Sequence, residues 1–159
     1  MVRFFVFITL SLSVISCNEG EIFNQYKSIE EQLWDKENTV EFKFENTDTV
    51  SRKNLFINLR NNNQYPFRTI FLIGKIEFPA GKNLIDTLEY AMTNEYGDFL
   101  GSGSTKIKEN KLFYKKGVLF EEKGSYKFTI RQATRAIDDI QGLKPLKGIT
   151  AVGISIEKE

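Results

Sequence analysis

The sequence YKFTIR, residues 126–131, alternates an apolar or aromatic side chain with a polar one at every step. Successive side chains of a β-strand point to opposite faces of its sheet, so this period of two predicts a strand with one buried face. The same alternation runs through VEFKF at residues 40–44. Strands of this kind are typical of antiparallel sheets that cover a core on one side.

Further segments extend this pattern over most of the chain. Residues 55–60 and 88–92 alternate in the same way, and residues 149–156 are expected to form the last strand. Residues 70–73 (IFLI) are apolar on both faces, which predicts a strand in the centre of its sheet. The turn-like residues 121–124 (EEKG) predict a hairpin between the two strands beside them.

Two short segments carry helical signals instead. Ser28-Ile29-Glu30-Glu31 has the form of a capping box, and apolar residues between positions 133 and 140 are spaced four and three apart. About seven or eight strands without βαβ alternation predict an all-β protein. We expect an antiparallel β-sandwich, jelly-roll or Ig-like, with one or two short helical turns, formed by residues 26–159 as a single domain.

Residues 1–16 have the layout of a lipoprotein signal peptide. Arg3 makes the start positive, and residues 4–15 (FFVFITLSLSVI) are uncharged and mostly apolar. This run is too short for a membrane-spanning helix, which needs about 20 apolar residues, and fits a secretory signal instead. The segment Val14-Ile15-Ser16-Cys17 resembles a bacterial lipobox. The resemblance implies cleavage before Cys17 and lipidation of its thiol.

The alternative interpretation is a buried apolar segment with an incidental cysteine. Cys17 is the only cysteine of the chain, so it has no intramolecular disulfide partner, and lipidation explains its presence in an exported protein. Residues 17–25 are then expected to be the lipidated cysteine and a polar tether. The expected location is the cell envelope, through a lipid anchor, at the outer membrane of a Gram-negative bacterium.

Composition narrows the classes of function. The sequence has no histidine, which removes the commonest general base and the commonest metal ligand. The whole chain has 22 Lys and Arg against 21 Asp and Glu, so removing Arg3 with the signal leaves 21 against 21. This balance gives no reason to expect a nucleic-acid partner. The glycine-rich residues 97–104 lack the lysine and helix of a phosphate-binding loop. We therefore expect no enzymatic activity, no cofactor and no metal.

Several segments together resemble the gliding-motility lipoprotein GldH family of the Bacteroidetes, and they follow the lipobox over nearly the whole mature chain. They are residues 40–44 (VEFKF), Leu59-Arg60-Asn61, Tyr65-Pro66, Asp86-Thr87-Leu88, residues 97–103, residues 124–128 (GSYKF), residues 132–135 (QATR), Gly148-Ile149 and residues 152–158 (VGISIEK).

The resemblance implies an accessory part of the gliding apparatus, which is tied to type IX secretion, with other envelope lipoproteins of that apparatus as partners. It implies no enzymatic activity and offers no catalytic residues. The sequence departs from the family pattern at Phe99, where a tryptophan is expected, and at Thr69, where an asparagine is expected. Both departures are compatible with a packing role.

Four residues are candidates for binding a protein partner: Arg60, Tyr65, Asp86 and Arg135. Arg60, Tyr65 and Arg135 stand beside expected turns, and Tyr and Arg are enriched at interface hot spots. A purely structural role is the alternative, with Arg60 paired to Asp86 and Arg135 to Asp139.

A lipid-anchored glycan-binding module is the rival function. It would need two or three aromatic side chains in a row on a solvent face, whereas most Phe and Tyr here fall on the alternating apolar faces.

Overall fold

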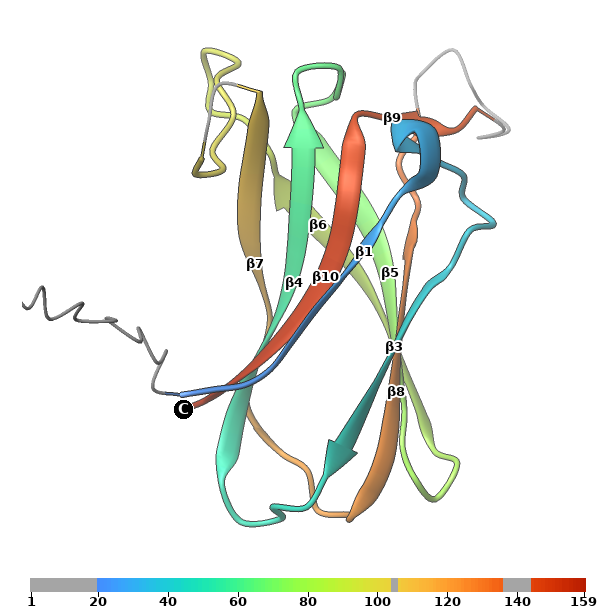
Figure 1. Ribbon diagram of the computed structural model, residues 1–159, viewed down its shortest axis with the longest axis vertical. Coiled ribbons are helices and arrows are strands. Elements are labelled where there is room, and N and C mark those ends of the chain that lie inside the picture. The colour runs from blue at the N-terminus through green and yellow to red at the C-terminus, as the bar shows by residue number, and fades with distance from the viewer. Residues whose placement is uncertain (1–19, 104–105, 136–143) are drawn as a thin grey trace, which may run out of the picture.

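The computed structural model describes residues 20–103, 106–135 and 144–159, and strands dominate it (Figure 1). The strands are β1 (Glu21–Ser28), β2 (Leu33–Trp34), β3 (Val40–Asn46), β4 (Arg52–Asn62), β5 (Thr69–Glu77), β6 (Asn83–Ala91), β7 (Ile107–Leu119), β8 (Gly124–Gln132), β9 (Leu146–Lys147) and β10 (Ile149–Lys158), and the 3-10 helix η1 spans Glu30–Gln32. Within the described residues, no helix is long and apolar enough to cross a membrane.

The strands pair in a nested order. β1 pairs with β10, β2 with β9, β3 with β8, β4 with β7, and β5 with β6, all antiparallel. Two further pairings, β10 with β4 and β5 with β8, join them into the sheets β1-β10-β4-β7 and β3-β8-β5-β6. The chain is therefore one long hairpin folded over itself into two four-stranded sheets, which is the jelly-roll arrangement and not the Ig-like one.

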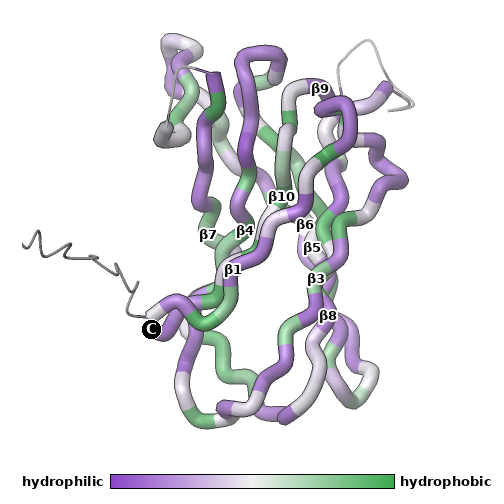
Figure 2. Tube along the Cα trace, viewed as in Figure 1, coloured by the Kyte–Doolittle hydropathy of each residue, from purple (hydrophilic) through white to green (hydrophobic). Residues whose placement is uncertain are grey.

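The core lies between the two sheets and is made by the alternating residues. Leu55, Ile57 and Leu59 of β4 are fully buried, as is the aromatic stripe of β8. Figure 2 shows apolar and polar residues interchanging along the strands. The period of two thus correctly predicted the all-β sandwich, and β5, which contains residues 70–73, lies inside its sheet as expected.

Local signals at the N-terminal side were less reliable. The tether expected over residues 17–25 is wrong for residues 21–25, because strand β1 begins at Glu21 and pairs along β10. A helical turn does follow, as η1, but Ile29 stands at its N-cap and no side chain caps it, so the expected capping box is not formed. Residues 136–140 of the second expected helix lie outside the described residues.

The turn at residues 121–124 does not close a hairpin. β7 pairs with β4 and β8 pairs with β3 and β5, so this turn carries the chain from one sheet to the other. Asn46, at the end of β3, donates hydrogen bonds to the carbonyl oxygens of Phe120 and Glu122 at 3.1 and 2.9 Å. The connection from β7 to β8 is therefore held by the buried side chain of Asn46, which is distant in the sequence.

Candidate functional site

A cluster of three polar side chains spans the solvent face of the sheet β1-β10-β4-β7. Tyr26 of β1 donates its hydroxyl hydrogen to Glu109 of β7 at 2.9 Å. Arg60 of β4 donates from Nε to the other Glu109 carboxylate oxygen at 2.8 Å. The Arg60 guanidinium also lies 4.2 Å from the centre of the Tyr26 ring. We call Tyr26, Arg60 and Glu109 the outer-face cluster.

Sheet register explains how Tyr26 reaches across the sheet. Tyr26 stands opposite Gly153 of β10, and a Cβ added at Gly153 would lie 2.8 Å from the Tyr26 ring. Since glycine has no side chain, the ring can lie across β10 towards β7. Leu55, Ile57 and Leu59 point inward, so alternation turns Arg60 outward on the same face as the tyrosine.

The cluster changes the ionisation of its members. Burial, followed by the hydrogen bond to Glu109, raises the pKa of Tyr26 to about 12. Burial alone would raise the pKa of Glu109, but the hydrogen bonds from Arg60 and Tyr26 outweigh it and hold that pKa below its ordinary value. At neutral pH the cluster is therefore a neutral phenol, a carboxylate and a guanidinium in fixed geometry.

Aromatic side chains continue the same face towards the other end of the sheet. Phe56 of β4 and Phe113 of β7 meet edge to face, with ring centres 5.1 Å apart. Lys111 lies 4.3 Å above the Phe56 ring and forms an ion pair with Glu157 at 2.6 Å. Phe113 is 47% exposed. The outer face thus combines aromatic rings with an arginine, and both residue types are enriched at protein interfaces.

Tyr65 is not a surface residue, so its burial favours a structural role over the predicted role in partner binding. Its side chain is buried, and its hydroxyl donates to the carbonyl oxygen of Thr69 at 2.9 Å. Its ring packs against Phe67 and Phe99, and burial raises its pKa. Phe99, where the family pattern leads one to expect tryptophan, therefore has a packing role.

Asp86 joins the two sheets at one edge. It accepts a hydrogen bond from Tyr114 at 2.9 Å and forms an ion pair with Lys115 at 2.9 Å, so β6 of one sheet is fastened to β7 of the other. The expected pairing of Arg60 with Asp86 is wrong, because Arg60 pairs with Glu109. Asp86 thus has a structural role between the sheets.

Arg135 lines a pocket of about 310 Å³ with mostly apolar walls. Phe67, against which Tyr65 packs, forms part of the same wall, so the structure brings the Tyr65 segment and Arg135 close together. The remaining lining residues are Leu33, Pro66, Thr134, Lys144, Pro145, Leu146 and Lys147. Asp139, the expected partner of Arg135, and Cys17 lie outside the described residues.

The four candidate residues therefore do not form one site. Arg60 alone lies on the open face of a sheet, and its partners Tyr26 and Glu109 were missed by the sequence analysis. Nothing in the sequence linked position 60 to position 26 or to position 109. Among the described residues, no group of three or more His, Cys, Asp or Glu side chains could hold a metal ion.

Comparison with known proteins gives a family match and similar relatives. Residues 21–156 match the family described as GldH lipoprotein. The chain is 46% identical over 154 residues to the gliding motility lipoprotein GldH homolog of Christiangramia forsetii, covering 97% of this chain and 94% of the relative. It is 44% identical to the gliding motility lipoprotein GldH of Flavobacterium johnsoniae, covering 97% and 95%.

A solved structure, the VP2 subviral particle of infectious bursal disease virus, matches at 12% identity and a TM-score of 0.28, covering 86% of this chain and 38% of that chain. A similarity at that TM-score supports no conclusion about this chain. The family, however, is shown by the match over residues 21–156 and by two relatives that align over nearly their full lengths. The chain belongs to the GldH lipoprotein family.

Proposed function

We propose that this protein is a non-enzymatic, lipid-anchored lipoprotein of the cell envelope that supports gliding motility and the associated type IX secretion apparatus through protein–protein contacts. Relatives named as gliding motility lipoproteins align over 94% and 95% of their lengths, which supports a shared role. The lipobox and the signal-like N-terminus support a lipid anchor in the cell envelope, and we place this anchor in the outer membrane.

Cys17 is the lipidated residue in this proposal. A mature bacterial lipoprotein carries three acyl chains, and two or more chains give stable membrane anchoring. Replacing Cys17 with alanine should leave uncleaved precursor without label when cells are grown with radioactive palmitate. Normal labelling of Cys17→Ala would refute the assignment.

The outer face of the sheet β1-β10-β4-β7 is the proposed docking surface for another envelope lipoprotein. The observation that carries this assignment is the outer-face cluster, in which Glu109 and Tyr26 hold Arg60 in one orientation. A side chain that is already ordered loses little conformational entropy on binding. The half-exposed ring of Phe113 supplies an apolar contact on the same face.

Charge reversal of Arg60 tests the docking surface. Arg60→Glu should keep the thermal midpoint close to that of the wild type and keep the membrane location, yet lose gliding and release crosslinked partners in pull-downs. Arg131→Glu is the matched control, because Arg131 is an exposed arginine on β8 of the opposite sheet. If both variants glide normally, or if both lose their partners, the docking face lies elsewhere.

Glycan binding ranks second, although one observation favours it. Tyr26, Phe56 and Phe113 lie on one face, as a sugar-binding platform requires. However, Arg60 lies over the Tyr26 ring and Lys111 over the Phe56 ring, so two of the three rings are already covered. A glycan array with the detergent-solubilised protein separates the two functions, because strong binding that is lost in Phe113→Ala would favour the glycan module.

A further inference from the structure

We propose that the end of the sandwich where the chain enters β1 lies against the lipid leaflet, with Val50, Ile22 and Leu119 at the headgroup region. This proposal rests on the lipid anchor at Cys17 that forms part of the proposed function. It goes further by assigning the surface of the domain that faces the membrane and the kind of partner that this surface meets.

Only a short segment separates the anchor from the folded domain. β1 begins at Glu21, and the carbonyl oxygen of Gly20 already accepts a hydrogen bond from Lys158 at 2.8 Å. Gly20 follows Cys17 by three residues, and three residues of fully extended chain span at most roughly 11 Å. The folded domain therefore begins within that distance of the Cys17 backbone.

Sheet register identifies which end of the domain is held there. Lys158, the partner of Gly20, stands opposite Lys53 of β4, next to the Arg52 end of that strand. Asn62, at the other end of β4, is nine residues from Lys53, which corresponds to about 30 Å of strand. Figure 1 shows the start of β1 beside the C-terminal end, with the loop between β3 and β4 below it.

Three exposed apolar side chains gather at the end near Gly20. Val50, in the loop between β3 and β4, is 84% exposed, and Ile22 and Leu119 are 37% and 36% exposed. Leu119 pairs with Arg52 across the sheet, and Arg52 follows Val50 by two residues along the chain. A pocket of about 200 Å³ is lined by Ile22 together with Asp48 and Lys53 of the loop region, so all three apolar residues lie at one end.

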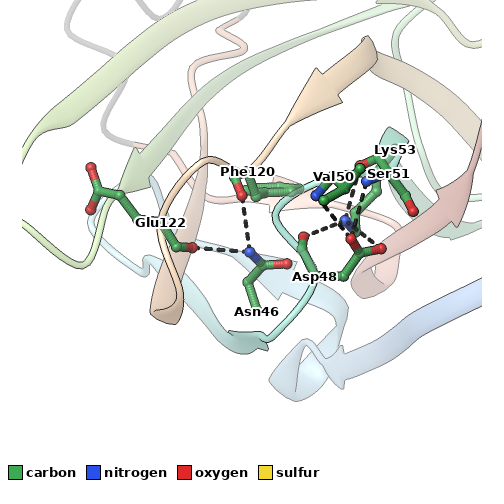
Figure 3. A network of polar contacts seen from close by, with 7 residues as sticks. All are labelled: Asn46, Asp48, Val50, Ser51, Lys53, Phe120 and Glu122. Atoms are coloured by element: carbon green, nitrogen blue, oxygen red, sulfur yellow. Dashed lines mark hydrogen bonds and ion pairs between the residues drawn. The ribbon is translucent and has the colours of Figure 1, made fainter.

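A buried lysine holds the loop that carries Val50 (Figure 3). The Lys53 side chain is only 1% exposed, and its ammonium group donates to the carbonyl oxygens of Asp48 and Ser51 at 2.9 and 3.1 Å. The Asp48 carboxylate accepts hydrogen bonds from the backbone N–H groups of Val50 and Ser51 at 2.9 and 3.0 Å. Val50 is therefore presented to solvent by a braced turn, which suits an apolar side chain that meets a surface.

Charges of both signs stand next to these apolar side chains, which decides the kind of lipid surface. The exposed cations Arg52 and Lys158 stand beside the exposed carboxylates Glu21 and Glu159. Anionic lipid would attract the first pair and repel the second. The contact is thus expected on zwitterionic phosphatidylcholine, with no requirement for anionic lipid and little dependence on salt.

Single thiols on the lipidated protein test this orientation. Lipidation occupies Cys17, the only native cysteine, so Val50→Cys introduces one free thiol for a fluorescent label. Tyr96→Cys is the matched control, because Tyr96 is 81% exposed and lies in the loop after β6 at the opposite end. Both labelled proteins are reconstituted into phosphatidylcholine vesicles, and the label is quenched by aqueous iodide or by doxyl lipid.

The label at position 50 should be several-fold less accessible to iodide than the label at position 96, and only the former should be quenched by doxyl lipid. Inserting about ten Gly and Ser residues between Glu19 and Gly20, a flexible link of roughly 17 Å, should remove the difference. Equal accessibility without the insertion, or lipid quenching at position 96, overturns the orientation. Vesicle flotation separates the two proposals, because protein that fails to float refutes the anchor itself and the orientation with it.

Discussion

Tyr26 shows how one residue on the outer face is tuned by its neighbours. Its phenol is partly buried and donates to the Glu109 carboxylate, and both conditions favour the neutral form, so its pKa is about 12 against an ordinary 10.0. A pKa raised on folding means that the neutral phenol stabilises the folded state fully below pH 10. That contribution is lost as the pH rises from 10 to about 12.

Alkaline titration measures this effect. Ultraviolet absorbance of the phenolate in the wild type, minus that of Tyr26→Phe, should show one group ionising near pH 12. Glu109→Gln should move that ionisation to lower pH, because the carboxylate no longer disfavours the phenolate. A difference curve centred at pH 10 in the wild type would show that Tyr26 does not make these contacts in solution.

Phe128 belongs to the stripe that marked the fold in the sequence, and its ring is 1% exposed between the sheets. Phe128→Ala should lower the free energy of unfolding by about 3 to 5 kcal/mol, because it removes apolar contacts and leaves a cavity. Thr129, the next residue along β8, points outward, so Thr129→Ala should cost less than about 0.5 kcal/mol. Urea unfolding of both variants gives the comparison, and equal losses would mean that the inward face is misassigned.

At the scale of elements, strands with two clearly different faces were predictable and edge structure was not. β3 and β8 alternate strictly because one face covers the core. In β1 only Phe23 and Tyr26 are partly buried, three residues apart, and a register shift follows Glu21. An edge strand with that spacing carries no period of two, so its residues were interpreted as a tether and a helical turn.

Strand partners and side-chain partners could not be predicted from the sequence, for a different reason. The turn at residues 121–124 has hairpin composition, yet the long-range pairs β4–β7 and β3–β8 decide that it joins two sheets. Arg60 meets Glu109 across 49 sequence positions. Charges of both signs are spread along the chain, so the sequence cannot choose between Asp86 and Glu109 without the strand order.

The contribution of β1 can be measured by truncation. A domain of residues 20–159 should be β-rich by circular dichroism and monomeric by size-exclusion chromatography, whereas residues 26–159 should unfold at a lower temperature. The shorter domain loses the edge-to-face contact between Phe23 and Phe44, whose ring centres are 5.5 Å apart, and part of the ladder on β10. Identical melting temperatures would mean that residues 20–25 act as a tether after all.

At the scale of the whole molecule, nested pairing places the first and last strands side by side. β1 pairs with β10 at the edge of one sheet, so a lipid attached just before β1 holds the domain at a defined point. Arg60 is seven residues from Lys53 along β4, about 23 Å of strand. The short link to Cys17 would then set both the height and the direction of the outer-face cluster above the leaflet.

This geometry leads to a prediction in the native host. Inserting about ten Gly and Ser residues between Glu19 and Gly20 adds a flexible coil of roughly 17 Å and frees the domain to rotate. Membrane location and thermal midpoint should stay unchanged, because the signal, the lipobox and every described contact remain. Gliding should fall, since Arg60 and Phe113 would face their partner for only a fraction of the time, and the effective concentration of the docking surface would drop.

The same insertion placed after Gly97, in the exposed loop that follows β6, is the control. It adds equal length at a loop tip, where insertions are tolerated, and leaves the link to the membrane as it was. Loss of gliding in the link variant alone would show that the anchor works as a spacer of fixed length as well as a membrane attachment. Full gliding in both variants would show that docking does not depend on a fixed orientation of the domain. The partner would then bind the outer face equally well on the longer, flexible link.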